Sequence, residues 1–138
     1  MTVISDTNKQ AIKGFVQGVL GCKCPSEVFL SINVEKNPTN FADLSQGDLI
    51  AIGGKLLVFL IKTDNGEILA SKLEQIFNRG REIRDKGGFH RFRLVISAPV
   101  KQPAEEILTR QFEILENPGE RLHLHVIVTD QLPDLSAQ

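Results

Sequence analysis

Residues 49–61, LIAIGGKLLVFLI, predict a tight β-hairpin. The apolar runs Leu49–Ile52 and Leu56–Ile61 flank Gly53-Gly54, and glycine readily adopts the positive backbone angles that such a turn needs. The second run is apolar at every position, whereas a strand with one solvent-exposed face alternates apolar and polar residues. We therefore expect Leu56–Ile61 to be a central strand that is covered on both faces.

The rest of the chain predicts an α/β fold. Apolar periodicity predicts helices at about Asp6 to Leu20, Asp64 to Gly87 and Pro103 to Leu115, and further strands at Val28–Val34, Phe92–Ile96 and Leu122–Val128. From residue 56 onward strands and helices alternate, which implies parallel strands joined by right-handed helical crossovers. We predict one globular domain over residues 1–138, an α/β sandwich with a mixed, mostly parallel sheet of four or five strands and helices on both faces.

The composition indicates an ordinary globular chain without a strong overall charge. Hydrophobic residues make up 41% and charged residues 24% of the chain, and 16 basic against 17 acidic residues give a net charge of -1. The first residues lack the pattern of a secretory signal, and no apolar run is long enough to cross a bilayer. We expect a soluble, cytoplasmic protein without a membrane partner, and a second copy of the chain is one candidate partner.

Cys22 and Cys24 are the only two cysteines, and they lie in the segment Cys22-Lys23-Cys24-Pro25. A disulfide between them would close a small, strained ring, so we expect the two cysteines to have another role. Two thiolates are suitable donors for zinc or iron. A short helical start after Cys24 would instead lower its thiol pKa and favour redox or sulfur chemistry. The alternative is that both thiols simply pack beneath a loop.

The histidines are candidate co-ligands for a metal. His123 and His125 alternate with apolar residues, which puts both imidazoles on one face of the last strand. His90 and His123 stand near strand starts, and the two cysteines also precede a strand. If the first strand runs parallel to the later ones, these donors meet at one edge of the sheet. The alternative is that His123 and His125 line a partly solvated sheet face.

A second group of polar residues follows the expected strands. Asp64, Ser97 and Asp130 lie at the carboxyl ends of three strands, where open parallel sheets bind ligands. The two aspartates could act as a paired acid and base or hold a divalent cation, with the serine nearby. The alternative is that all three residues are helix caps and turn formers.

Residues 79–93 are strongly basic, with six basic and two acidic residues and therefore a net charge of +4. Their arginines form a candidate binding patch: Arg79, Arg81, Arg84, Arg91 and Arg93. Such a patch suits an acidic protein surface or RNA, with RNA the less favoured partner. The alternative is a solvated helix end.

Two function hypotheses follow from these features. In the first, the protein is a thiol protein whose Cys-x-Cys-Pro loop binds a metal or takes part in redox or sulfur chemistry, with His123 and His125 completing a metal site. In the second, it is a non-enzymatic binding or assembly domain that uses the basic patch, and its cysteines are structural. The sequence alone does not decide whether the protein is an enzyme.

Overall fold

The computed structural model describes most of the chain, namely residues 2–3, 6–21, 23, 25–36, 47–63, 66–115 and 121–133. Its elements in chain order are β1 (Thr2–Val3), α1 (Asp6–Gly14), the π-helical turn η1 (Phe15–Val19), the 3-10 helix η2 (Ser26–Leu30), β2 (Ile32–Lys36), β3 (Asp48–Ile52), β4 (Leu56–Lys62), α2 (Glu67–Gly87), β5 (Arg91–Ala98), α3 (Ala104–Leu115), β6 (Leu122–Val128) and the 3-10 helix η3 (Thr129–Gln131).

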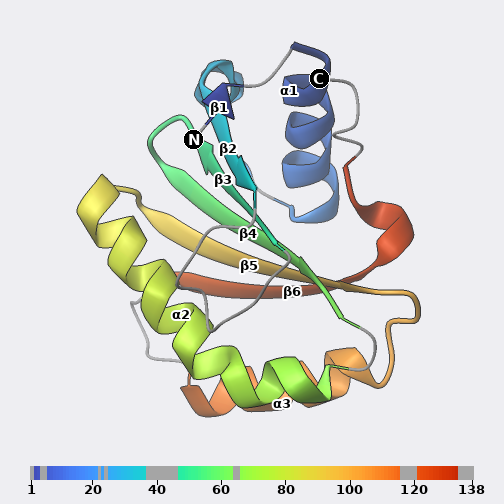
Figure 1. Cartoon of the computed structure of the whole chain (residues 1–138). Helices are drawn as coiled ribbons and strands as arrows, with labels where there is room; N and C mark the ends of the chain where they lie inside the picture. Colours follow the sequence, from blue (N-terminus) through green and yellow to red (C-terminus); the bar gives the residue numbers. More distant parts are fainter. Residues whose placement is uncertain are drawn as a thin grey trace.

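The strands of the described residues form one sheet in chain order, from the two-residue β1 to β6 (Figure 1). Neighbours from β1 to β4 pair antiparallel, whereas β4, β5 and β6 pair in parallel. The predicted α/β class with a mixed sheet is confirmed, but the prediction of a mostly parallel sheet is wrong. A parallel pair needs a long crossover, and the crossovers through α2 and α3 produce two parallel pairs against three antiparallel ones.

The predicted hairpin joins β3 to β4. Its two glycines have φ angles of 59° and 66°, and the Lys55 amide donates a 3.0 Å hydrogen bond to the Ile52 carbonyl oxygen. Every residue of Leu56–Ile61 is buried, as expected for a strand covered on both faces. A Cβ atom at Gly53 would lie 2.5 Å from the carbonyl oxygen of Val28, so the hairpin also packs closely against η2.

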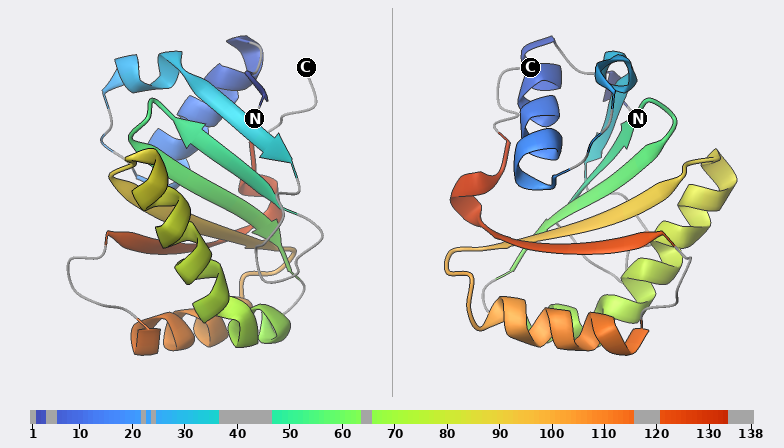
Figure 2. Two further views of the ribbon diagram at one scale, coloured as in Figure 1. Left: turned by 60° about the vertical axis from the view of Figure 1, so that its left-hand side comes forward. Right: turned by 180° about the vertical axis from the view of Figure 1, so that it is seen from behind.

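Two hydrophobic clusters lie on opposite faces of the sheet. On one face Leu57, Phe59 and Phe92 pack beneath α2 and α3. On the other face Val58 and Val95 pack with residues of α1, η1 and η2. Figure 2 shows α1 on one side of the sheet and the pair α2 and α3 on the other. The alternation along β4 and β5 therefore decides which side chains each group of helices covers.

The close packing of α2 on β5 determines the orientation of that strand. A Cβ atom at Gly80 would lie 2.4 Å from the ring of Phe92, and the same ring meets Phe77 edge to face with a centroid distance of 5.8 Å. Phe92 thus points into the cluster beneath α2. Because side chains alternate along a strand, its neighbours Arg91 and Arg93 point to the opposite face of the sheet.

The N-terminal part differs from the sequence prediction. The expected helix over residues 6–20 is α-helical only to Gly14 and continues as the π-helical η1. Gly21 then adopts a φ of 72°, consistent with its predicted role as the residue that stops the helix. The expected strand from Val28 begins only at Ile32, because the preceding residues form η2.

The sequence left open whether β2 runs in the same direction as the later strands. β2 is antiparallel to β3, and β3 is antiparallel to β4, so β2 runs in the same direction as β4, β5 and β6. The starts of these four strands therefore lie at the same end of the sheet. The segment before β2 comes from the same end of the sheet as the segments before β4 and β5.

Candidate functional site

Two basic side chains of β5 lie beside two histidines of β6. Arg91 and Arg93 share the face of β5 that is turned away from α2, and His123 and His125 share the corresponding face of β6. The two strands are parallel neighbours, with Arg93 directly opposite His123. The four side chains therefore form one polar strip on the same face of the sheet as α1.

Each arginine in this strip is paired with one histidine. The Nη1 atom of Arg91 lies 3.0 Å from Nε2 of His123, and Nη1 of Arg93 lies 2.8 Å from Nε2 of His125. A guanidinium group can only donate hydrogen bonds, so each Nε2 atom must accept and carry no proton. Both imidazoles are then neutral, with the proton on Nδ1.

The surroundings keep the histidines neutral. Burial, followed by the charge of Arg93, lowers the pKa of His125 to about 4 from the ordinary value of 6.5. The same two causes, with Arg91 as a third, lower the pKa of His123. Burial and the neighbouring charge of Arg91 also lower the pKa of Arg93. The arginines thus keep neutral hydrogen-bond acceptors, and their positive charges are not cancelled by these partners.

A pocket of about 400 Å³ opens beside the two arginines. Among the described residues, its lining combines two lysines, two arginines, one histidine and three apolar residues, without an acidic one: Lys23, Pro25, Val28, Lys55, Leu56, His90, Arg91 and Arg93. The volume falls within the range of small-molecule sites. Since like charges repel in a partly desolvated space, this arrangement favours an anion that neutralises them.

Three chain segments are held together to form the pocket. The carbonyl oxygen of Lys55 accepts hydrogen bonds from the backbone amides of His90 at 2.7 Å and Arg91 at 3.3 Å, which ties the hairpin to the start of β5. The amide of Gly53 donates a 2.7 Å hydrogen bond to the carbonyl oxygen of Ser31, which ties the same hairpin to the end of η2. The backbone rather than any ligand therefore brings the cations together.

The arginines of the pocket have no carboxylate partner among the described residues. Their hydrogen bonds go to the two imidazoles, and the Nε atom of Arg93 is buried without any acceptor in the described part of the chain. A buried donor without an acceptor costs roughly 1–3 kcal/mol. In the part of the chain that the structure describes, no side chain therefore brings a negative charge to these two arginines.

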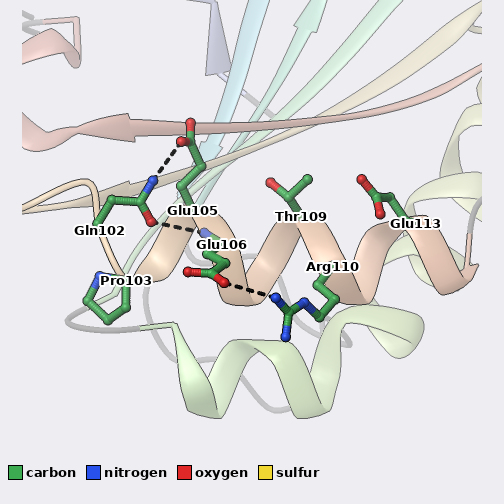
Figure 3. A pocket seen from close by; sticks show the side chains of 7 residues that line it. All are labelled: Gln102, Pro103, Glu105, Glu106, Thr109, Arg110 and Glu113. Carbon is green, nitrogen blue, oxygen red and sulfur yellow. Dashed lines mark hydrogen bonds and ion pairs between the residues drawn. The ribbon is translucent and has the colours of Figure 1, made fainter.

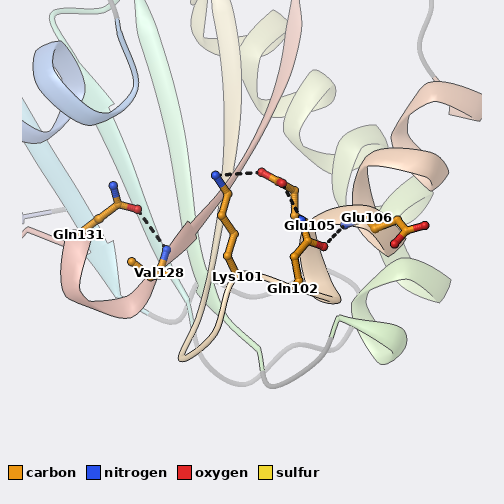
Figure 4. A network of polar contacts seen from close by, with 6 residues as sticks. All are labelled: Lys101, Gln102, Glu105, Glu106, Val128 and Gln131. Atoms are coloured by element: carbon orange, nitrogen blue, oxygen red, sulfur yellow. Dashed lines mark hydrogen bonds and ion pairs between the residues drawn. The ribbon is translucent and has the colours of Figure 1, made fainter.

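A larger hollow of about 740 Å³ along α3 differs from the basic pocket because its lining contains carboxylates (Figure 3). Two of its three carboxylates already have partners: Glu105 accepts from Gln102 at 2.8 Å and lies 3.0 Å from the ammonium group of Lys101 (Figure 4), and Glu106 pairs with Arg110 at 2.9 Å. These contacts lie within a few residues of one another on a helix surface and are solvent-exposed. They stabilise α3 and balance the charges of Glu105 and Glu106, so this hollow has no cluster of like charges comparable with that of the basic pocket.

The two predicted thiol residues, Cys22 and Cys24, lie outside the described residues. Lys23 between them and Pro25 after them both line the basic pocket, together with His90. His123 and His125 already accept hydrogen bonds from arginines. In the described part of the chain, no three His, Cys, Asp or Glu side chains gather closely enough to hold a metal ion. The metal and redox roles stay predictions.

The five arginines of the predicted binding patch lie on two faces. Arg91 and Arg93 line the pocket, whereas the other three belong to α2 on the opposite side of the sheet. There Arg79 pairs with Glu82 at 2.7 Å, Arg81 contacts Asn78 at 3.1 Å, and Arg84 is buried and contacts Asp85 at 3.1 Å. The structure does not bring the five together on one surface.

The polar residues at the strand ends differ in how far they are buried. Ser97 is 1% exposed, and its hydroxyl has no hydrogen-bond partner among the described residues. Asp130 is exposed in η3, where Gln131 accepts a 3.1 Å hydrogen bond from the Val128 amide (Figure 4). Asp64 lies outside the described residues. The pairing of Asp64 with Asp130 as acid and base therefore stays a prediction.

Sequence reasoning missed two cations of the pocket, Lys23 and Lys55, as ligand-binding residues. Lys55 directly follows the glycines of the hairpin, and Lys23 stands between the cysteines. Neither position has a periodic pattern that marks it. Only the shared direction of β2, β4 and β5 places both near Arg91.

Comparisons with protein-family models, with curated proteins and with solved structures found no match to this chain. A search of the described helices for a long apolar segment that could cross a membrane also found none.

Proposed function

We propose that this protein binds a small anionic ligand in the pocket between η2, the β3–β4 hairpin and the start of β5. The observation that carries this proposal is the lining: among the residues that the structure describes, four cationic side chains and one histidine surround about 400 Å³ without an acidic residue. This is a specific form of the binding-domain hypothesis, in which the two arginines of β5 are the central contacts.

The arginines are suited to this role because their histidine partners orient them without neutralising them. Arg91 and Arg93 each use an Nη1 donor for an imidazole, and a guanidinium has five N–H donors in total. The remaining donors can bind phosphate or carboxylate oxygens, and such charge-assisted hydrogen bonds are stronger than neutral ones. Lys23 and Lys55 add two further positive charges.

A small ligand fits this geometry better than RNA or an acidic protein. An extended polyanion binds along a continuous basic surface. Here the basic residues of α2 lie on the other face of the sheet, and Arg84 is buried. Arg91 and Arg93 instead converge with two lysines on one pocket, which is the arrangement expected for a compact anion.

Titration with inorganic phosphate in a buffer of low ionic strength tests the proposal by calorimetry. We expect phosphate to bind, and the Arg91→Gln/Arg93→Gln double variant to bind it at least about tenfold more weakly, because two charge-assisted contacts are lost. The matched control is Arg79→Gln/Arg81→Gln, which removes the same charge from the opposite face. We expect its affinity to change by less than about twofold, because distant surface charges are screened.

Two results would contradict the proposal. One is the absence of phosphate binding by the unmodified protein at low salt. The other is an equal loss of affinity in both double variants, which would show that only the net charge matters. Circular dichroism of each variant establishes that it is folded before binding is compared.

We keep a second proposal for Cys22 and Cys24, namely that they bind zinc or iron or take part in redox or sulfur chemistry. The observation in its favour is that Lys23 and Pro25, their neighbours in the chain, line the cationic pocket. Nearby positive charge stabilises thiolates, the form that binds metals and reacts. The test is the metal content of protein purified without added metal, compared with that of a variant lacking both thiols.

A further inference from the structure

The pocket has an apolar part beside its charged part. Pro25, Val28 and Leu56 line it together with the cations. Val28 is half-buried, and Leu56 is only 4% exposed. A bare inorganic anion would be bound by the charged residues and would leave the exposed surface of Pro25 and Val28 in contact with water.

The two parts are arranged side by side across the sheet. In the register of the parallel pair, Leu56 of β4 lies opposite Arg91 of β5. Neighbouring strands are about 4.8 Å apart, so the apolar surface begins one strand away from the arginines. Val28 extends this surface toward η2, because the hairpin packs directly against its backbone at Gly53.

From this arrangement we propose, on the basis of the anion-binding function above, that the ligand is a small organic anion with an apolar body. Its charged head, a phosphate monoester or a carboxylate, lies against Arg91 and Arg93. Its aromatic or aliphatic body lies across the start of β4 against Leu56 and Val28. A six-membered ring attached to the head has about the reach that one strand spacing requires.

Phenyl phosphate and inorganic phosphate are the probes that separate the two contributions. Both carry the same kind of head, and only phenyl phosphate has an apolar body. We expect phenyl phosphate to bind about tenfold more tightly, the factor expected when about half of a phenyl ring leaves water. The measurement is calorimetric titration of the full chain with each probe in the same low-salt buffer.

A variant on the apolar side gives a second readout. Val28→Thr keeps the shape of the side chain and replaces a methyl group by a hydroxyl. We expect it to reduce the preference for phenyl phosphate by at least about threefold, since a hydroxyl is costly to bury against a ring. The readout is the ratio of its affinities for the two probes, in which any change common to both cancels.

The outcomes distinguish this inference from the proposed function. If phenyl phosphate binds more tightly and Val28→Thr reduces only that preference, the inference is supported. If both probes bind equally well, the apolar body has no role, and the inference fails while anion binding stands. If neither probe binds, both proposals fail. If Val28→Thr weakens both probes equally, the side chain acts on the shape of the pocket and the apolar contact is refuted.

Discussion

Acidification should destabilise the fold through His125, because this histidine must stay neutral beside Arg93. Its pKa is about 4 in the folded protein and 6.5 in the absence of the fold. Between these two values the unfolded chain binds a proton that the folded protein does not. The contribution of His125 to stability is therefore fully present above pH 6.5 and is lost as the pH falls toward 4.

The size of the effect follows from the two pKa values. At about pH 5 most unfolded chains and roughly a tenth of folded ones carry the proton, which lowers the free energy of unfolding by about 2 kcal/mol relative to about pH 7.5. The ring of His125 is partly exposed, and solvent screening reduces this to about 1 kcal/mol. His123 adds a change of the same sign, because its pKa is lowered too.

Urea unfolding at the two pH values measures the loss, and His125→Asn separates it from the titration of carboxylates. The asparagine side chain can still accept a hydrogen bond from Arg93 but does not titrate. The pH dependence of its stability should be smaller than that of the unmodified protein by about 1 kcal/mol over this range. His90→Asn is the matched control, since it leaves the His125–Arg93 pair intact.

Direct titration by NMR provides the refuting result. If the ring protons of His125 titrate with a midpoint near 6.5, its surroundings do not hold the imidazole neutral. An unchanged pH dependence in His125→Asn would refute the energetic argument as well.

Two further predictions concern packing and the thiols. Gly80→Ala should lower the free energy of unfolding by roughly 1–3 kcal/mol, because its Cβ atom would lie 2.4 Å from the buried ring of Phe92. A Cβ atom at Gly14 would meet no atom within 4 Å, so Gly14→Ala should raise the free energy of unfolding by roughly 1 kcal/mol in the same chemical unfolding assay. If the thiols hold a metal, purified protein should contain near-stoichiometric zinc or iron by elemental analysis, and Cys22→Ser/Cys24→Ser should lose it. Protein without metal and with ordinary, slow thiol reactivity would contradict both thiol roles.

The parts of the fold that depend on local chemistry could be predicted from the sequence. Two consecutive glycines between apolar runs predict the β3–β4 hairpin because few other residues adopt positive φ angles. The alternation over Leu122–Val128 predicts β6 with the bounds that the structure has. In both cases a few neighbouring residues carry all the information needed.

The parts that depend on distant contacts could not be predicted in the same way. The alternation from Val28 indicates a strand, but the residues up to Leu30 form η2, and Leu30 is 74% exposed. The packing of the hairpin against Val28 favours this conformation, and it involves residues far apart in the chain. The antiparallel pairing of β2 with β3 likewise follows from tertiary contacts, which explains the error in the predicted sheet.

The candidate site shows the same division between local and distant information. Alternation places Arg91 and Arg93 on one face of their strand, and His123 and His125 on one face of theirs. It does not indicate that the two pairs hydrogen-bond to each other, because that requires β5 and β6 to be parallel neighbours in this register. The alternation of His123 and His125 therefore suits two roles: it could present metal ligands, and in the structure it presents hydrogen-bond acceptors to Arg91 and Arg93.

The choice of histidine as the partner determines what the strip can bind. A carboxylate in place of either imidazole would form an ion pair and cancel the charge of its arginine. A neutral imidazole positions the guanidinium through one hydrogen bond and leaves the charge available. Burial, followed by the charge of Arg91, lowers the pKa of Arg93 and so disfavours its charged form. An anion in the pocket would stabilise the charged guanidinium, which is the contribution that the proposed ligand makes.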